Sequence, residues 1–203
     1  LEFDVAVYLL AAGNESPALE ALERCLRVST SDPERTLALC ERGATLRQRG
    51  SYRAADEALE QARLVCPLYA SGGARARAEV GLALLHLDQS RFREAAEILD
   101  RAEHLINAPG QPASVRAEAK AARARIASSK PETQAQALEL CQDALRIAPL
   151  ACEAHFAQIG AFVTLGRQAD ALAYARAQAN NPRLTPRDRH RIATVAKRLA
   201  DSR

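Results

Sequence analysis

The stretch TLALCERGATLRQRGSYRAADEALEQARLVCP, residues 36–67, decides the fold. It contains two runs with the apolar spacing of an amphipathic helix, separated by Gly50, which allows a tight turn. It ends at Pro67, a residue that cannot extend a helix. Gly43 is a small residue where two helices would cross, and Leu59 is large enough to fill the seam between them. The stretch therefore predicts a helical hairpin.

Prolines close similar runs along the whole chain. They are Pro33, Pro67, Pro109, Pro149 and Pro182, at successive steps of 34, 42, 40 and 33 residues. A unit of this length cannot bury its apolar face alone, so the copies must stack on one another. The copies are predicted at 1–33, 36–67, 76–109, 114–149 and 152–182. The residues in excess of 34 are assigned to loops, 68–74 and 108–113, because loops tolerate insertions at small entropic cost.

The best copy resembles the tetratricopeptide repeat (TPR), with its pattern W-x2-L-G-x2-Y, A-x3-F, A and P. The matching positions are Leu39, Gly43, Leu46, Gly50, Tyr52, Ala55, Leu59, Ala62 and Pro67. The resemblance is specific for 36–67, good for 76–109 and weaker at both ends. It implies an all-α fold, a right-handed α-solenoid of about five helical hairpins that forms a single array over residues 1–203. The expected seam residues are Leu39, Leu46, Leu59, Leu82, Ala83, Leu99, Leu140, Phe162 and Leu172.

Residues 185–202 predict one further helix that caps the array. Thr185 suits the N-cap and Pro186 the first helical position, and Asp188 approximates the acid of a capping box. Its polar face fits the outer side of a terminal element. A basic helix that binds a partner or a membrane surface is the alternative.

The distribution of charge excludes some partners. The formal net charge is +3, and residues 183–203 alone carry seven Lys or Arg against two Asp, so the rest of the chain is slightly acidic. We therefore expect no nucleic-acid partner. No run of 18 apolar residues predicts a membrane span, and the start, Leu1-Glu2-Phe3-Asp4, lacks the basic region of a signal peptide. Because the chain also lacks Met, we interpret it as a fragment of a longer protein.

The residues that often carry chemistry are scattered. Five cysteines without a C-x-x-C spacing predict neither a disulfide framework nor a zinc site, and we expect reduced thiols in a cytoplasmic protein. The four histidines lie in separate elements, and neither G-x-S-x-G nor G-x-x-x-x-G-K occurs. The sequence therefore predicts no cofactor, no metal and no enzyme activity.

In TPR proteins the first helix of each repeat lines a concave groove that takes peptides or partner helices. The corresponding positions of the third and fourth copies are Arg77, Val80, Leu84, Leu87, Arg116, Lys120 and Arg123. Arginine suits carboxylate recognition because its donors form a planar fork, so we predict a groove for a protein or peptide ligand, with an acidic or C-terminal peptide as the candidate. The alternative is that these cations are solvated helix faces.

Co-chaperone TPR domains that hold acidic C-terminal tails use a carboxylate clamp with Asn in their first helices. The clamp positions of the 36–67 copy are instead Cys40 and Ala44, so clamp-type binding is not expected. The predicted function is a non-catalytic protein–protein interaction module, an adaptor, scaffold or co-chaperone-like segment. Two alternatives remain: a regulatory domain that controls an effector region elsewhere in the protein, and self-association through the first hairpin.

Overall fold

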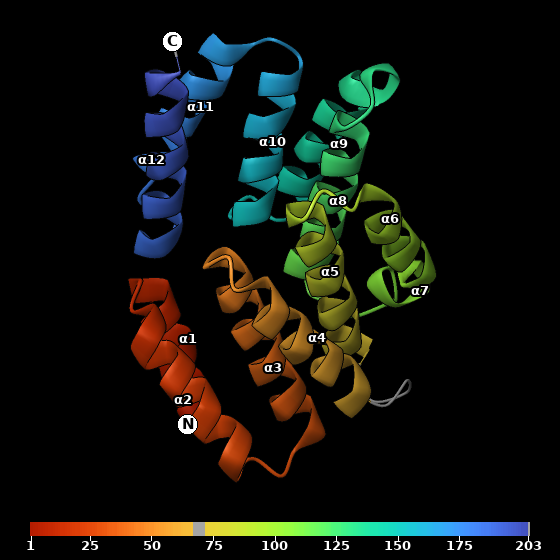
Figure 1. Ribbon diagram of the computed structural model, residues 1–203, viewed down its shortest axis with the longest axis vertical. Coiled ribbons are helices and arrows are strands. Elements are labelled where there is room, and N and C mark those ends of the chain that lie inside the picture. Colours follow the sequence, from red (N-terminus) through yellow and green to blue (C-terminus); the bar gives the residue numbers. More distant parts are fainter. Residues whose placement is uncertain (67–71, 203) are drawn as a thin grey trace. The chain divides into compact units, whose positions relative to one another are not determined.

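The structure is a computed structural model that describes residues 1–66 and 72–202 (Figure 1). All regular structure within those residues is helical. Pro67 and the first part of the loop expected at 68–74 lie outside them. The chain divides into two compact units, Leu1–Val115 and Arg116–Arg203, which are described separately below.

The first unit is a series of antiparallel helical hairpins. Helices α1 (Glu2–Ala12) and α2 (Glu15–Val28) form the first, and α3 (Asp32–Gln48) and α4 (Tyr52–Val65) form the second. The third joins α5 (Gly72–Asp88) to α6 (Phe92–Arg101) and the short α7 (Glu103–Ile106). Helix α3 packs against α2, α4 and α5, and α4 also packs against α5 (Figure 1). Helix α5 begins four residues before the predicted start of its copy, so Gly72 and Gly73 belong to the helix rather than to a loop.

The second unit continues the pattern. It holds most of α8 (Ala113–Ser128), a 3-10 turn at Pro131–Thr133, and α9 (Gln134–Ile147). Helices α10 (Cys152–Thr164) and α11 (Gln168–Ala179) form its next hairpin. Helix α12 (Pro186–Asp201) then packs on α11, at the place predicted for the terminal helix (Figure 1).

Four hairpins share one turn between their two helices. A residue in the left-handed region closes the first helix: Gly13, Gly50, Ser90 and Gly166, with φ of 87°, 76°, 59° and 71°. In each, the next amide donates to a carbonyl five residues back, as Ser51 N does to Leu46 O at 2.9 Å. This is the Schellman pattern, for which glycine carries no steric cost. The shared turn puts α1, α3, α5 and α10 in one register, so their residues can be compared position by position.

Alanine dominates the core. Ala18, Ala55, Ala95, Ala137 and Ala171, one in each second helix, are all fully buried. Small side chains let the helix backbones approach closely, and larger residues fill the remaining space. Of the predicted seam residues, seven are buried, whereas Leu46 and Leu140 are only half-buried.

Candidate binding face of the first helices

The apolar members of the predicted groove are buried. Val80, Leu84 and Leu87 on α5 are 0%, 3% and 3% exposed. A side chain this buried cannot contact a ligand while the packing stays as it is. These three residues therefore belong to the core, and the cations are the members of the predicted set that remain candidates for ligand contact.

Arg77 lies on α5 and forms an ion pair with Glu41 on α3. Both side chains remain partly exposed, at 29% and 22%. A ligand carboxylate at Arg77 would have to compete with Glu41, which is not among the residues predicted for the groove. The sequence does carry one sign of this pair: Glu41 has the charge opposite to Arg77 and lies 36 residues before it, about one repeat away. Arg47 and Asp88 join the same two helices at 2.6 Å, with Arg47 only 5% exposed.

The other predicted cations, Arg116, Lys120 and Arg123, lie on the part of α8 in the second unit. Their spacing of i, i+4 and i+7 puts them along one side of the helix. Arg116 is exposed and the other two are half-buried. Lys120 Nζ lies 3.6 Å from Asp143 Oδ2 on α9. The neighbouring stripe of Ala117, Ala121 and Ala124 is fully buried and packs into the core of this unit.

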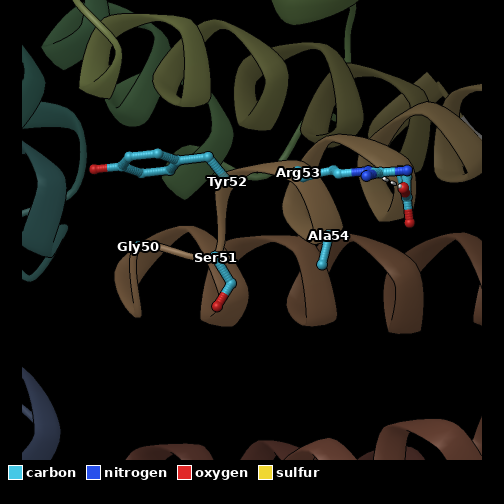
Figure 2. A pocket seen from close by; sticks show the side chains of 6 residues that line it. Gly50, Ser51, Tyr52, Arg53 and Ala54 are labelled. Carbon is cyan, nitrogen blue, oxygen red and sulfur yellow. Dashed lines mark hydrogen bonds and ion pairs between the residues drawn. The ribbon is translucent and has the colours of Figure 1, made fainter.

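An open recess occurs at the turn between α3 and α4 (Figure 2). It is lined by Gly50, Ser51, Tyr52, Arg53, Ala54 and Glu57. Figure 2 shows the Tyr52 and Arg53 side chains pointing away from each other at the start of α4. Arg53 Nε is 3.2 Å from Glu57 Oε1, so the two charged residues of the recess pair with one another. All six residues come from one turn and the start of one helix, so the recess brings no distant groups together.

A buried histidine in the second unit is engaged on both ring nitrogens. His155 on α10 is 3% exposed, with Nδ1 2.7 Å from the Tyr174 hydroxyl and Nε2 3.1 Å from the Pro149 carbonyl oxygen. Because a carbonyl can only accept, Nε2 carries the proton, and Nδ1 accepts from the Tyr174 hydroxyl. Burial lowers the pKa of His155 and raises that of Tyr174. Both groups are neutral and fully paired, as expected of a structural site.

Arg191 attaches α12 to α10. Its guanidinium lies 4.6 Å from the centre of the Phe156 ring, and Nη2 is 3.3 Å from Glu153 Oε1. Nη1 is 3.8 Å from Asp188 Oδ1 on its own helix. A charge-assisted contact and a cation–π contact from one side chain hold α12 in place. Arg191, one of the cations of α12, therefore makes its contacts within the protein.

Burial raises the thiol pKa of Cys25, Cys66, Cys141 and Cys152. Four of the five cysteines are buried, and burial raises the pKa of Cys141 to about 12. Raised pKa values disfavour the thiolate, which is the nucleophile and the metal ligand. Within residues 1–66 and 72–202, no group of three or more His, Cys, Asp or Glu side chains could hold a metal ion.

Comparison with known proteins finds similarity in structure. No family model matches the sequence. No curated protein matches it either. Among solved structures, the thermophilic TPR protein TTC0263 of Thermus thermophilus is 22% identical, with a TM-score of 0.63 over 95% of this chain and 96% of that one. Yeast Tom70 is 14% identical, with a TM-score of 0.57 over 99% of this chain and 39% of its own.

The chain has the tetratricopeptide repeat fold. The TPR hairpins predicted from the sequence correspond to α1/α2, α3/α4, α5/α6, α8/α9 and α10/α11. Stacked TPR hairpins present extended helical surfaces. None of the described helices has the length and apolar character needed to cross a membrane.

Proposed function

We propose that the chain is a non-catalytic adaptor or scaffold module that binds an acidic peptide on its first helices. The cations Arg116, Lys120 and Arg123 of α8 are the contact that carries the proposal. They follow one side of the helix, and a peptide laid along that side could meet all three.

The burial pattern around α8 supports this proposal. The alanine stripe of α8 is committed to the core, whereas its cations stay at least partly exposed. Lys120 is already drawn toward Asp143, so a carboxylate ligand would replace one surface pair with another. Surface pairs are individually weak, so affinity must come from several cations acting on one peptide. Arg77, which is paired with Glu41, has a smaller part in this proposal.

A peptide-display library with free C-termini tests the proposal without knowledge of the natural ligand. Binders are selected on the wild-type chain and measured by fluorescence anisotropy against Arg116→Ala/Lys120→Ala/Arg123→Ala. We expect acidic binders whose affinity falls at least about tenfold in the triple variant, which is about 1.4 kcal/mol. Their affinity should also weaken as salt is raised.

A control variant removes two exposed arginines that lie on other helices. Arg53 and Arg93 have side chains that are 95% and 90% exposed, and each pairs with a glutamate on its own helix. Arg53→Ala/Arg93→Ala should bind the selected peptides as the wild type does. Equal losses in the two variants would mean nonspecific charge attraction, and unchanged binding in the triple variant would exclude the α8 face.

A further inference from the structure

One carboxylate of the second unit lies between two cations. Asp143 on α9 has its Oδ2 atom 3.6 Å from Lys120 Nζ on α8. Its Oδ1 atom is 2.9 Å from Arg146 Nη2 on its own helix. Each oxygen of the carboxylate therefore faces a different cation, and the two cations come from different helices. All three side chains reach solvent.

The packing of α8 against α9 fixes this arrangement. One buried cluster joins the two helices through small side chains, among them Ala121 and Ala144, and small side chains let helices approach closely. Lys120 and Asp143 directly precede these two alanines, so they lie at the edge of the seam. Arg146 follows Asp143 by three residues, on the same side of α9. Helix α9 thereby adds a fourth cation to the row on α8.

The charges at this edge leave room for a ligand carboxylate. Lys120 and Arg146 share the single negative charge of Asp143, so one positive charge remains in excess. Ion pairs between exposed side chains are individually weak, and Asp143 can turn out into water when another carboxylate takes its place. Glu139, the other acid of α9, is exposed one turn before Asp143.

We propose that Lys120 and Arg146 form a carboxylate-binding subsite for an acidic peptide, with Asp143 as the competitor that determines which peptides bind. This inference rests on the proposed function, and it adds a contact residue, Arg146, and a specificity-determining residue, Asp143, to the same face. The planar guanidinium fork of Arg146 suits a carboxylate. A peptide with one carboxylate only exchanges with Asp143, whereas a peptide with several also reaches the other α8 cations. The face therefore selects peptides that carry several acidic residues.

A fluorescent hexaglutamate peptide tests the role of Asp143 without knowledge of the natural ligand. It is titrated at low salt into the wild-type chain, Asp143→Asn and Glu139→Gln, and binding is followed by fluorescence anisotropy. Asp143→Asn keeps the size of the side chain and removes its charge, so binding should become about threefold to fivefold tighter. Glu139→Gln removes the same charge one turn away and is the matched control. Its affinity should change by less than about twofold.

Arg146→Ala tests whether Arg146 contacts the peptide or only holds Asp143. Both roles predict weaker binding in the wild-type background, because Asp143 without Arg146 pairs more fully with Lys120. Only a direct contact has an effect once Asp143 has lost its charge. Asp143→Asn/Arg146→Ala should therefore bind at least about threefold more weakly than Asp143→Asn. Arg176→Ala, which removes an exposed arginine from the last turn of α11, should bind as the wild type does.

The possible failures are distinguishable. Equal affinities of the wild type and Asp143→Asn, or equal gains in Asp143→Asn and Glu139→Gln, overturn the role of Asp143. Equal affinities of Asp143→Asn and the double variant overturn the role of Arg146. The proposed function fails instead if Arg116→Ala/Lys120→Ala/Arg123→Ala binds hexaglutamate as the wild type does, and absence of binding even to Asp143→Asn overturns both. Because Asp143 and Arg146 are partly exposed, their variants should keep the helical circular dichroism of the wild type.

Discussion

Leu59 is held between two glycines of neighbouring first helices. A Cβ added at Gly43 would lie 2.5 Å from Leu59 Cγ, and one at Gly81 would lie 2.8 Å from Leu59 Cδ2. The Leu59 side chain is 1% exposed, so any shift that makes room for an added Cβ must take place inside the core. Gly160, in α10, has no atom within 4 Å of the same added Cβ. The two glycine substitutions therefore give opposite predictions.

Gly43→Ala should destabilise the protein, because overpacking costs about 1–3 kcal/mol and exceeds the gain of about 1 kcal/mol in helix propensity. Gly160→Ala should stabilise it by up to about 1 kcal/mol, since only the propensity changes. Urea denaturation followed by circular dichroism measures both. If Gly43→Ala raised the midpoint as Gly160→Ala does, the contact with Leu59 would be absent in solution.

The pairing of His155 predicts a dependence of stability on pH. Burial lowers its pKa in the folded state, so below about pH 6.5 the unfolded chain binds a proton that the folded chain does not. Its contribution is therefore present above pH 6.5 and is lost as the pH falls toward the folded pKa. Burial also lowers the pKa of His86, which acts in the same direction.

Between pH 7 and pH 5.5 the free energy of unfolding should fall with a slope of at most about 1.4 kcal/mol per pH unit for each histidine. His155→Gln should flatten this slope, and His155→Gln/His86→Gln should flatten it further. Urea midpoints at four pH values test this. The control variant is His104→Gln, at an exposed position. A slope that stays the same in His155→Gln would contradict the role given to His155.

The sequence predicts the N-cap of α12, and the structure confirms it. Thr185 Oγ1 accepts from the Asp188 amide at 3.1 Å, and its hydroxyl donates to Asp188 Oδ2 at 2.8 Å. Pro186 occupies the first turn, as predicted. Helix α4, by contrast, has Ser51 at its N-cap, and the Ser51 side chain makes no capping hydrogen bond.

Thr185→Ala should therefore cost about 1 kcal/mol, within the range measured for lost N-caps. Ser51→Ala at the start of α4 removes a hydroxyl that makes no cap bond and should cost much less. Both are measured as shifts in the urea midpoint. Equal shifts would show that the Thr185 bond does not stabilise α12.

The hairpins and their turns follow from local chemistry, and the sequence therefore predicts them well. Gly50 and Gly166 mark turns that need a positive φ, and Thr185 and Pro186 mark a helix start. The break between α6 and α7 at Ala102 has no glycine or proline to announce it, and the expected single second helix of the third copy is divided there. Gly72 and Gly73, expected in a loop, lie in α5.

The candidate binding face was harder to predict because it depends on which side of a helix faces the core. The spacing of Val80, Leu84 and Leu87 is helical whether these residues face solvent or another helix, and they are in fact buried. The pairs Arg77–Glu41 and Arg191–Glu153 join residues 36 and 38 positions apart, and only the packing of the helices brings them together. The placement of Arg116, Lys120 and Arg123 along one side of α8 depends only on the helix period, so it could be predicted from the sequence.

The TPR architecture, made of hairpins that contact mainly their neighbours, has a consequence for the cooperativity of the chain. In such arrays stability is close to a sum of hairpin and neighbour terms, so damage stays local. Leu59 in the first unit and Ile192 in the second are fully buried, and truncating either should cost about 2–5 kcal/mol. We expect the loss to appear as faster amide exchange in the unit that carries the substitution.

Hydrogen exchange followed by mass spectrometry separates the two cases. Ile192→Ala should accelerate exchange in α10, α11 and α12 and leave α3 and α4 protected, because its cluster joins residues of those three C-terminal helices. Leu59→Ala should do the reverse, since Leu59 contacts the first helices α3 and α5. Each variant thus serves as the control for the other at matched burial. If both variants accelerated exchange throughout the chain by the same factor, the two units would unfold as one, and the neighbour-limited description would fail.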